Sequence, residues 1–220
     1  MTHIRGVILD VDGTLIESND AQARSWVEAM AEHGYHVPYE QVRRLIGKGG
    51  DKVLPETIGI SKDSDEGKQI SDRRGEIYKQ RFLPTLKPTP GAKALVEEMR
   101  HRGLKVSVAS SAPPDELKAS LQIVGASDLV EEASSSKDAK ESKPAPNIVE
   151  ATLKKMNYSA DEVVMLGDTP YDIESAQKIG IGTIAVRCGG WNDSALAGAI
   201  AIYDDPADLL AHYDSSPLSQ

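Results

Sequence analysis

Val7-Ile8-Leu9-Asp10-Val11-Asp12-Gly13-Thr14 is the stretch that decides the fold. Its apolar run ends abruptly in two carboxylates and a glycine, which is typical of the first buried strand of an α/β sheet. Because side chains alternate along a strand, Asp10 and Asp12 face the same side and Val11 points away. In such sheets, ligands bind at the carboxyl ends of the strands. Two close like charges favour a divalent metal, a nucleophile paired with an acid, or both; the alternative is a solvated polar turn.

Strands and helices alternate along most of the remaining chain. After the first strand, the pattern predicts strands at residues 105–109, 129–133, 162–166 and 182–186. It predicts helices between them at residues 91–102, 113–124, 147–156 and 171–179. This alternation indicates a parallel, doubly wound, Rossmann-like sheet with helices on both faces.

The segment between the first strand and Thr89 follows a different pattern, because no strand is predicted from Glu17 onward. Ser18-Asn19-Asp20 offers N-cap chemistry for a helix, two shorter helices follow, and a charged helix covers residues 63–82. We therefore expect an α/β core domain made of residues 1–15 and 89–220. An all-helical domain made of residues 16–88 is inserted into it.

Composition narrows the possible functions. The 220-residue chain has a net charge of -9 and a sequence pI of about 5.1. This is the wrong sign for nonspecific binding to nucleic acid or to a membrane surface, but it does not exclude a small anionic substrate. Cys188 is the only cysteine, so no internal disulfide can form. With no signal region and no apolar run long enough to span a bilayer, we expect a cytoplasmic protein.

Polar residues follow several of the predicted strands. Ser110 ends the second strand, and Lys143 precedes a later helix. Asp168 ends the fourth strand, and Asp172 lies one helical turn further on. In a parallel sheet these residues meet at one edge, where the carboxylates suit Mg²⁺ and the lysine and hydroxyl suit a phosphoryl group. Taken singly, Ser110 is more often a strand-end cap and Lys143 a solvated lysine, while Asp168 can also cap a helix.

Together these residues resemble the four motifs of the haloacid dehalogenase-like (HAD) hydrolase superfamily. The motifs are Asp10-Val11-Asp12-Gly13-Thr14-Leu15, Ser110, Lys143-Pro144 and Gly167-Asp168-Thr169-Pro170-Tyr171-Asp172. The helical insertion resembles the superfamily's C1-type α-helical cap. The similarity is greatest to the branch of phosphoglycolate phosphatases and β-phosphoglucomutases.

The resemblance implies a role for each site residue. Asp10 is expected to be the nucleophile that forms an aspartyl-phosphate, and Asp12 the general acid and base. Ser110, with Thr14 and Ser111 nearby, is expected to hold the phosphoryl group, and Lys143 to balance its charge. The metal set, expected to hold Mg²⁺, comprises Asp10, Asp168, Asp12 through its backbone carbonyl, and Asp172, which could instead orient Lys143.

The acid at position 12 favours phosphoryl transfer, because dehalogenases of the superfamily typically lack it. We therefore expect a Mg²⁺-dependent phosphatase for a small phosphorylated metabolite. In the helical segment, Lys48 and Lys52 are the candidates for a second anionic group of that substrate, although each alone is more often a solvated lysine.

Two alternatives stay open. A phosphomutase would use the same intermediate, but β-phosphoglucomutases carry a histidine where Gln22 stands and an arginine near where Gly50 stands. A non-catalytic phosphate-binding protein on the same fold ranks last, because every expected catalytic residue is present.

Overall fold

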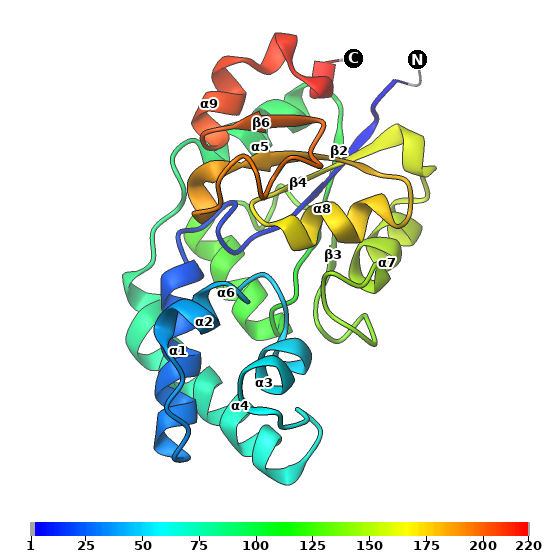
Figure 1. Ribbon diagram of the computed structural model, residues 1–220. Helices are drawn as coiled ribbons and strands as arrows, with labels where there is room; N and C mark the ends of the chain where they lie inside the picture. The colour runs from blue at the N-terminus through cyan, green and yellow to red at the C-terminus, as the bar shows by residue number, and fades with distance from the viewer. Residues whose placement is uncertain (1–2, 220) are drawn as a thin grey trace.

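A parallel sheet forms the centre of the molecule in the computed structural model, which describes residues 3–219 (Figure 1). Within these residues the sheet has six strands in the order β3-β2-β1-β4-β5-β6, and every neighbouring pair is parallel. The strands are β1 (Gly6–Leu9), β2 (Lys105–Ala109), β3 (Glu132–Ser134), β4 (Val163–Gly167), β5 (Gly182–Val186) and β6 (Ala201–Tyr203). The predicted parallel α/β fold is confirmed, with Val7–Leu9 in the central strand β1 and the two acids directly after it.

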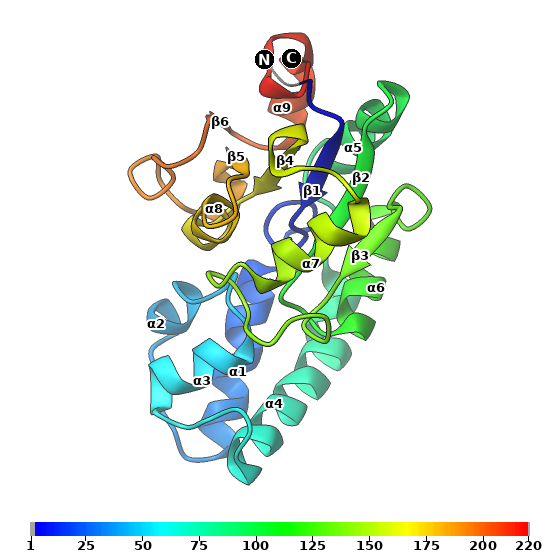
Figure 2. The same ribbon diagram turned by 90° about the vertical axis from the view of Figure 1, so that its right-hand side faces the viewer.

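Helices cover both faces of the sheet (Figure 2). They are α5 (Ala92–His101), α6 (Pro114–Val124), α7 (Asn147–Met156), α8 (Pro170–Gln177) and α9 (Pro206–Ala211). Val7 and Leu9 pack in one buried cluster with α5, α6 and α9, whereas Ile8 packs in another with α7 and α8. Strand alternation therefore buries β1 on both sides, as the continuous apolar run predicts. Among the described helices, none is long and apolar enough to cross a membrane.

The segment between β1 and α5 is helical and has a hydrophobic cluster of its own. It contains α1 (Asn19–Glu32), α2 (Tyr39–Arg43), α3 (Gly50–Ile58), α4 (Asp65–Ile77) and a π-helical turn, Tyr78–Phe82. Trp26, Met30, Leu54 and Ile70 are buried in the cluster. We call residues 17–88 the helical segment below. It lies at the end of the sheet where β1 finishes (Figures 1 and 2).

The two chain crossings into and out of the helical segment lie side by side. The Glu17 backbone N–H donates to Lys87 at 3.0 Å, and the Thr89 N–H donates to Leu15 at 3.0 Å. Ile16, between them, is buried in the cluster beneath the sheet. Paired crossings of this kind suit a segment that moves as a unit, and the two-domain division stays a prediction.

The structure departs from the predicted elements mainly at the sheet edges. The strand predicted at residues 129–133 instead forms at Glu132–Ser134, because Leu129 closes a turn onto Ala126. The edge strand β6 and the helix α9 have no counterpart among the predicted elements. β6 has only three residues, all half-buried, so its hydrophobic pattern is weak.

Candidate active site

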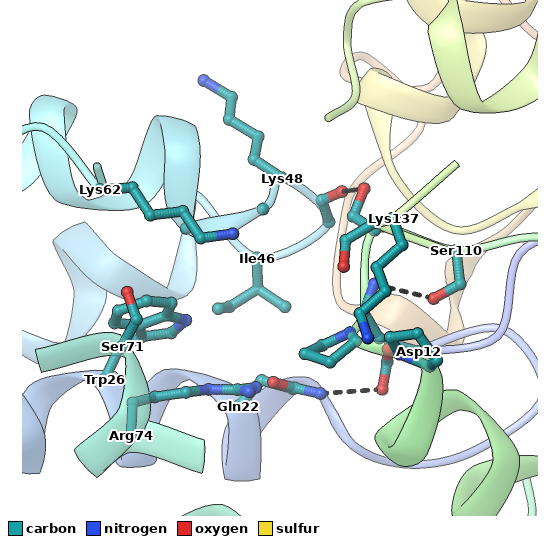
Figure 3. A pocket seen from close by; sticks show the side chains of 18 of the residues that line it. Asp12, Gln22, Trp26, Ile46, Lys48, Lys62, Ser71, Arg74, Ser110 and Lys137 are labelled. Carbon is teal, nitrogen blue, oxygen red and sulfur yellow. Dashed lines mark hydrogen bonds between the residues drawn. The ribbon is translucent and has the colours of Figure 1, made fainter. Parts of the chain in front are cut away.

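A cavity of about 360 Å³ separates the carboxyl ends of β1 and β2 from the helical segment (Figure 3). The α/β part contributes Asp10, Asp12, Ser110 and Ser111 to its lining, and the helical segment contributes Trp26, Ile46, Lys62 and Arg74. The volume is within the range of pockets that hold small ligands. A ligand there would contact both parts of the molecule at once.

Lys143 binds two carboxylates beside this cavity. Its Nζ lies 2.5 Å from Asp10 Oδ1 and 2.7 Å from Asp172 Oδ1, and its side chain is fully buried. Asp10, Asp168 and Asp172 each place a carboxylate oxygen within 4.8 Å of the others. Residues from β1, the loop after β3, β4 and α8 are thus brought together at the sheet edge, where the strand ends were predicted to meet.

The first turns after β1 hold this cluster in place. Thr14 donates to Asp168 at 3.1 Å, and Asn19 donates to the other oxygen of Asp168 at 2.8 Å. Gly13 has a φ of +81°, and a Cβ there would lie 2.1 Å from Asn19 and 2.3 Å from Asp168. The Asp-x-Asp-Gly pattern therefore needs glycine both for its backbone conformation and for the space that these side chains occupy.

Ser18 and Asn19, from the stretch predicted to cap a helix, contribute side chains to the site. Ser18 is the N-cap residue of α1 but makes no capping hydrogen bond. Its hydroxyl donates to Asp12 at 2.5 Å, and Asn19 reaches Asp168. Serine and asparagine are as well suited to binding carboxylates as to capping, so local sequence could not separate the two roles.

Burial and mutual repulsion decide the protonation of the acids. Burial raises the pKa of Asp10, and Asp172 and Asp168 raise it further, while Lys143 lowers it. Burial and the charge of Asp172 raise the pKa of Asp168 to about 7, against hydrogen bonds from Asn19 and Thr14. Burial lowers the pKa of Lys143 by disfavouring its charged form. The carboxylates of Asp10 and Asp172 have the larger combined effect, so the pKa of Lys143 is raised.

The donor set fits a divalent cation. Three carboxylates surround one ammonium, so the ionised cluster has an excess of negative charge that a cation would balance. All three offer hard oxygen ligands of the kind that Mg²⁺ prefers. A further oxygen, Asn19 Oδ1, is buried without a hydrogen-bond donor from the described residues. The Asp12 carboxylate lies outside this cluster.

Asp12 faces the cavity and is held by the start of the helical segment. Ser18 and Gln22 both donate to Oδ1, Gln22 at 3.1 Å, and no donor from residues 3–219 reaches Oδ2 (Figure 3). Its carboxyl is thus oriented through one oxygen while the other stays available. This arrangement suits a group that exchanges a proton with a ligand.

The predicted serines lie at the cavity in different roles. Ser110 is buried, and its Oγ accepts a hydrogen bond from the Ala112 backbone N–H at 3.1 Å. The Ser111 hydroxyl instead donates to the Gly47 carbonyl of the helical segment at 3.2 Å. Thr14 lies within the acid cluster and is not part of the cavity wall.

Lys48 and Lys52 are both paired with glutamates. Lys48 lies 2.8 Å from Glu56, and in Figure 3 its side chain extends away from the cavity centre although it borders the wall. Lys52 lies 2.5 Å from Glu141 and does not border the cavity. Two lysines that the sequence did not single out, Lys62 and Lys137, border the cavity without a side-chain partner among the described residues.

Arg74 and Glu116 form a buried ion pair between the helical segment and the α/β part. Arg74 Nη1 lies 2.7 Å from Glu116 Oε1, and the side chains are 7% and 2% exposed. The guanidinium also lies over the rings of Trp26 and Tyr78. Burial raises the pKa of Glu116, and Arg74 opposes this shift. No pattern in the sequence pairs these two residues, because they are 42 positions apart on different elements.

Glu116→Ala is expected to lower the free energy of unfolding by about 3 kcal/mol, because it leaves the Arg74 charge buried and unpaired. The measurement is urea unfolding followed by circular dichroism. The matched control is Glu131→Ala, which breaks the exposed pair with Arg100 and should cost less than about 1 kcal/mol. Equal, small losses in both variants would contradict the expectation.

Comparison with known proteins agrees with this geometry. The family model described as haloacid dehalogenase-like hydrolase matches residues 7–186. A phosphoglycolate phosphatase of Rhodospirillum rubrum is 27% identical over 221 residues, covering 93% of this chain and 89% of its own. A hydrolase structure from Pseudomonas syringae is 27% identical with a TM-score of 0.89, covering 96% of this chain and 98% of its own.

A β-phosphoglucomutase structure from Clostridium difficile has a TM-score of 0.84 at 18% identity, over 98% of this chain and 97% of its own, and so supports the fold alone. The family match spans the first strand with its two acids, the Lys143 loop and the strand that ends in Asp168. The resemblance inferred from the motifs is therefore confirmed: this chain belongs to the haloacid dehalogenase-like hydrolases.

Proposed function

We propose that the protein is a Mg²⁺-dependent phosphatase that hydrolyses a small phosphorylated metabolite through an aspartyl-phosphate. The observation that carries the proposal is the position of Asp10, a carboxylate that borders the cavity and is bound by a buried ammonium at 2.5 Å. A relative from Rhodospirillum rubrum named as a phosphatase supports the same class of reaction.

In the first half-reaction, an Asp10 oxygen forms a bond to phosphorus as the ester P–O bond breaks. Asp12 donates a proton to the leaving alkoxide, so that the alcohol departs neutral. In the second half-reaction, Asp12 takes a proton from a water molecule, which attacks the acyl-phosphate and restores Asp10. The orientation of Asp12 by Ser18 and Gln22 is consistent with this double role.

The remaining residues balance charge on the transferred group. Lys143, Ser110 and the backbone N–H groups near Ser110 would contact phosphoryl oxygens. Asp10, Asp168 and Asp172 would hold Mg²⁺, which would neutralise the phosphoryl group during transfer. Since Asp172 already contacts Lys143, it could serve by orienting that lysine.

The helical segment, which the sequence predicts as residues 16–88, is proposed to act as a cap that opens and closes over the site. Closure would exclude water and supply substrate contacts. Lys48 and Lys52 stay candidates for a second anionic group only if their glutamate pairs break. Lys62 and Lys137 are the better candidates for binding that second anionic group, because both border the cavity.

A phosphomutase is the second candidate, since it would use the same nucleophile. Gln22 counts against it, because the amide that donates to Asp12 at 3.1 Å carries no titratable proton to shuttle. Gly50, at the start of α3, likewise offers no cation. A non-catalytic phosphate-binding role ranks below both. A cytoplasmic location stays a prediction.

The deciding experiment is a screen of phosphorylated metabolites with Mg²⁺ and, in parallel, with a chelator. Release of free phosphate that requires the metal supports the phosphatase. Interconversion of sugar phosphates in the presence of a bisphosphate primer supports the mutase. Failure of a well-folded sample to hydrolyse any ester, p-nitrophenyl phosphate included, would favour the non-catalytic role.

Mg²⁺ is expected to stabilise the protein more at about pH 8 than at about pH 5, because the cation competes with protons for the acid cluster. The folded protein keeps the Asp168 proton up to about pH 7, whereas the unfolded chain loses it near pH 4. Without metal, this contribution to stability is complete below about pH 4 and is lost as the pH rises through about 7.

Thermal unfolding with and without Mg²⁺ at both pH values measures the effect. At high occupancy we expect an increase in Tm of about 5–10 °C near pH 8. The control is Asp168→Asn, which should remove most of the difference between the two pH values. An equal Mg²⁺ shift at both pH values would contradict the assignment of these acids to the metal.

A further inference from the structure

Ser142, which directly precedes the buried Lys143, contacts the helical segment. The Gly49 backbone N–H donates to Ser142 Oγ at 2.8 Å, and the Ser142 N–H donates to Asp51 Oδ2 at 3.1 Å. Gly49 and Asp51 belong to the start of α3, and Ser142 is only 5% exposed. The beginning of α3 therefore holds this serine by both its backbone and its side chain.

The contact continues into Lys143 itself. The Ser142 hydroxyl, while accepting from Gly49, lies 3.4 Å from the Lys143 carbonyl oxygen and points its proton toward it. From this backbone the Lys143 side chain runs to its two carboxylates, Asp10 at 2.5 Å and Asp172 at 2.7 Å. The residue that contacts the helical segment is thus the immediate chain neighbour of the lysine beside the nucleophile.

We infer that Ser142 and Asp51 are positioning residues: docking of the helical segment through them sets the backbone from which Lys143 reaches Asp10. The inference rests on the proposed function, in which Lys143 acts on the phosphoryl group. Residues 135–142 form a loop between β3 and α7, with no helix or strand to fix its end. Two hydrogen bonds from α3 supply the constraint that secondary structure does not.

Close packing at Gly49 supports this reading. A Cβ there would lie 2.9 Å from Ser142 Cβ and 2.7 Å from Asp51 Oδ1. The φ of Gly49 is -86°, which any residue adopts, so space and not backbone conformation demands glycine. A side chain at this position would push the start of α3 away from Ser142.

The neighbouring ion pair supplies the control. Lys52 and Glu141 lie on the same contact face, and Glu141 is 57% exposed. Glu141→Ala removes a solvent-exposed charge pair between the same two segments, and no described hydrogen bond joins the Glu141 side chain to Ser142. If this contact face only holds the two segments together, Glu141→Ala should lower kcat as much as substitution of Ser142, Asp51 or Gly49 does.

The test compares Ser142→Ala, Asp51→Ala and Gly49→Ala with Glu141→Ala in steady-state phosphate release. Each of the first three is expected to lower kcat by about 10-fold or more, with KM changed by less than about threefold. Glu141→Ala should change kcat by less than about twofold. A rise in KM at unchanged kcat would overturn the inference, because it indicates loss of substrate binding alone. Equal losses of kcat in all four variants would also overturn it, because they indicate a general effect of docking.

A spectroscopic measurement follows Lys143 directly and needs no turnover. In protein labelled with ¹⁵N-lysine, the buried Lys143 Nζ signal is identified by its loss in Lys143→Arg. We expect this signal to shift or broaden in Ser142→Ala and Asp51→Ala and to stay in place in Glu141→Ala. An unchanged signal in folded Ser142→Ala and Asp51→Ala proteins would refute the positioning role. Since this readout is independent of activity, it can succeed even if the phosphatase proposal fails.

Discussion

Asp10→Asn is expected to abolish phosphate release, with a loss of at least roughly 10⁴-fold in kcat. The amide cannot attack phosphorus, so neither ester cleavage nor the acyl-phosphate can follow. The change keeps the shape of the side chain, and Asp172 still pairs with Lys143 at 2.7 Å, so the fold should persist. Phosphate release and mass spectrometry of acid-quenched enzyme measure the two consequences.

The control for Asp10→Asn is Asp20→Asn, which alters an exposed carboxylate on α1 that pairs with Arg43. This variant should retain wild-type turnover. Asp10→Ala serves as a second test of the nucleophile, and circular dichroism reports whether each variant is folded. Residual activity above about 1% in a folded Asp10 variant would rule out the covalent route, because losing a nucleophile costs far more.

Asp12→Ala is expected to slow hydrolysis of alkyl phosphates by about 10²–10⁴-fold. Its kcat/KM for p-nitrophenyl phosphate should fall much less, because p-nitrophenolate departs without needing a proton. Comparing kcat/KM for the two substrate types isolates the protonation step. The matched control is Asp72→Ala, which removes an exposed carboxylate from the opposite wall of the cavity.

Equal losses on both substrate types would contradict the acid role of Asp12. The same variant also tests the second half-reaction, in which Asp12 activates water. With p-nitrophenyl phosphate, loss of that step should make the aspartyl-phosphate accumulate, so that a burst of p-nitrophenolate precedes slow turnover. Absence of any burst in a variant that still cleaves this substrate would assign water activation to another group.

The acids of the site could be predicted from the sequence because the topology of a parallel sheet determines where they lie. Apolar runs that end in Asp10 and Asp168 identify strand ends, and parallel strands bring such ends to one edge. Lys143 could be placed there only by its resemblance to a family motif, since a lysine in a polar loop has no pattern of its own. The structure places it 2.5 Å from Asp10.

The cavity wall could not be predicted in the same way. The sequence predicts a glycine-rich turn at Lys48 and Lys52 and so suggests substrate contact. In the structure Lys52 lies in α3, and Glu56 and Glu141 pair with the two lysines. Whether a surface lysine finds such a partner depends on how separate segments pack, which local sequence does not reveal. The pairing of Arg74 with Glu116 is unpredictable for the same reason.

The carboxyl-terminal residues have a practical consequence for handling the protein. Tyr213 and Leu218 are buried in the hydrophobic cluster that also contains Val7 and Leu9, so trimming the last ten residues would remove part of the core. Both ends of the described chain lie opposite the helical segment (Figures 1 and 2). An affinity tag or surface tether at this end of the chain would therefore lie away from the helical segment.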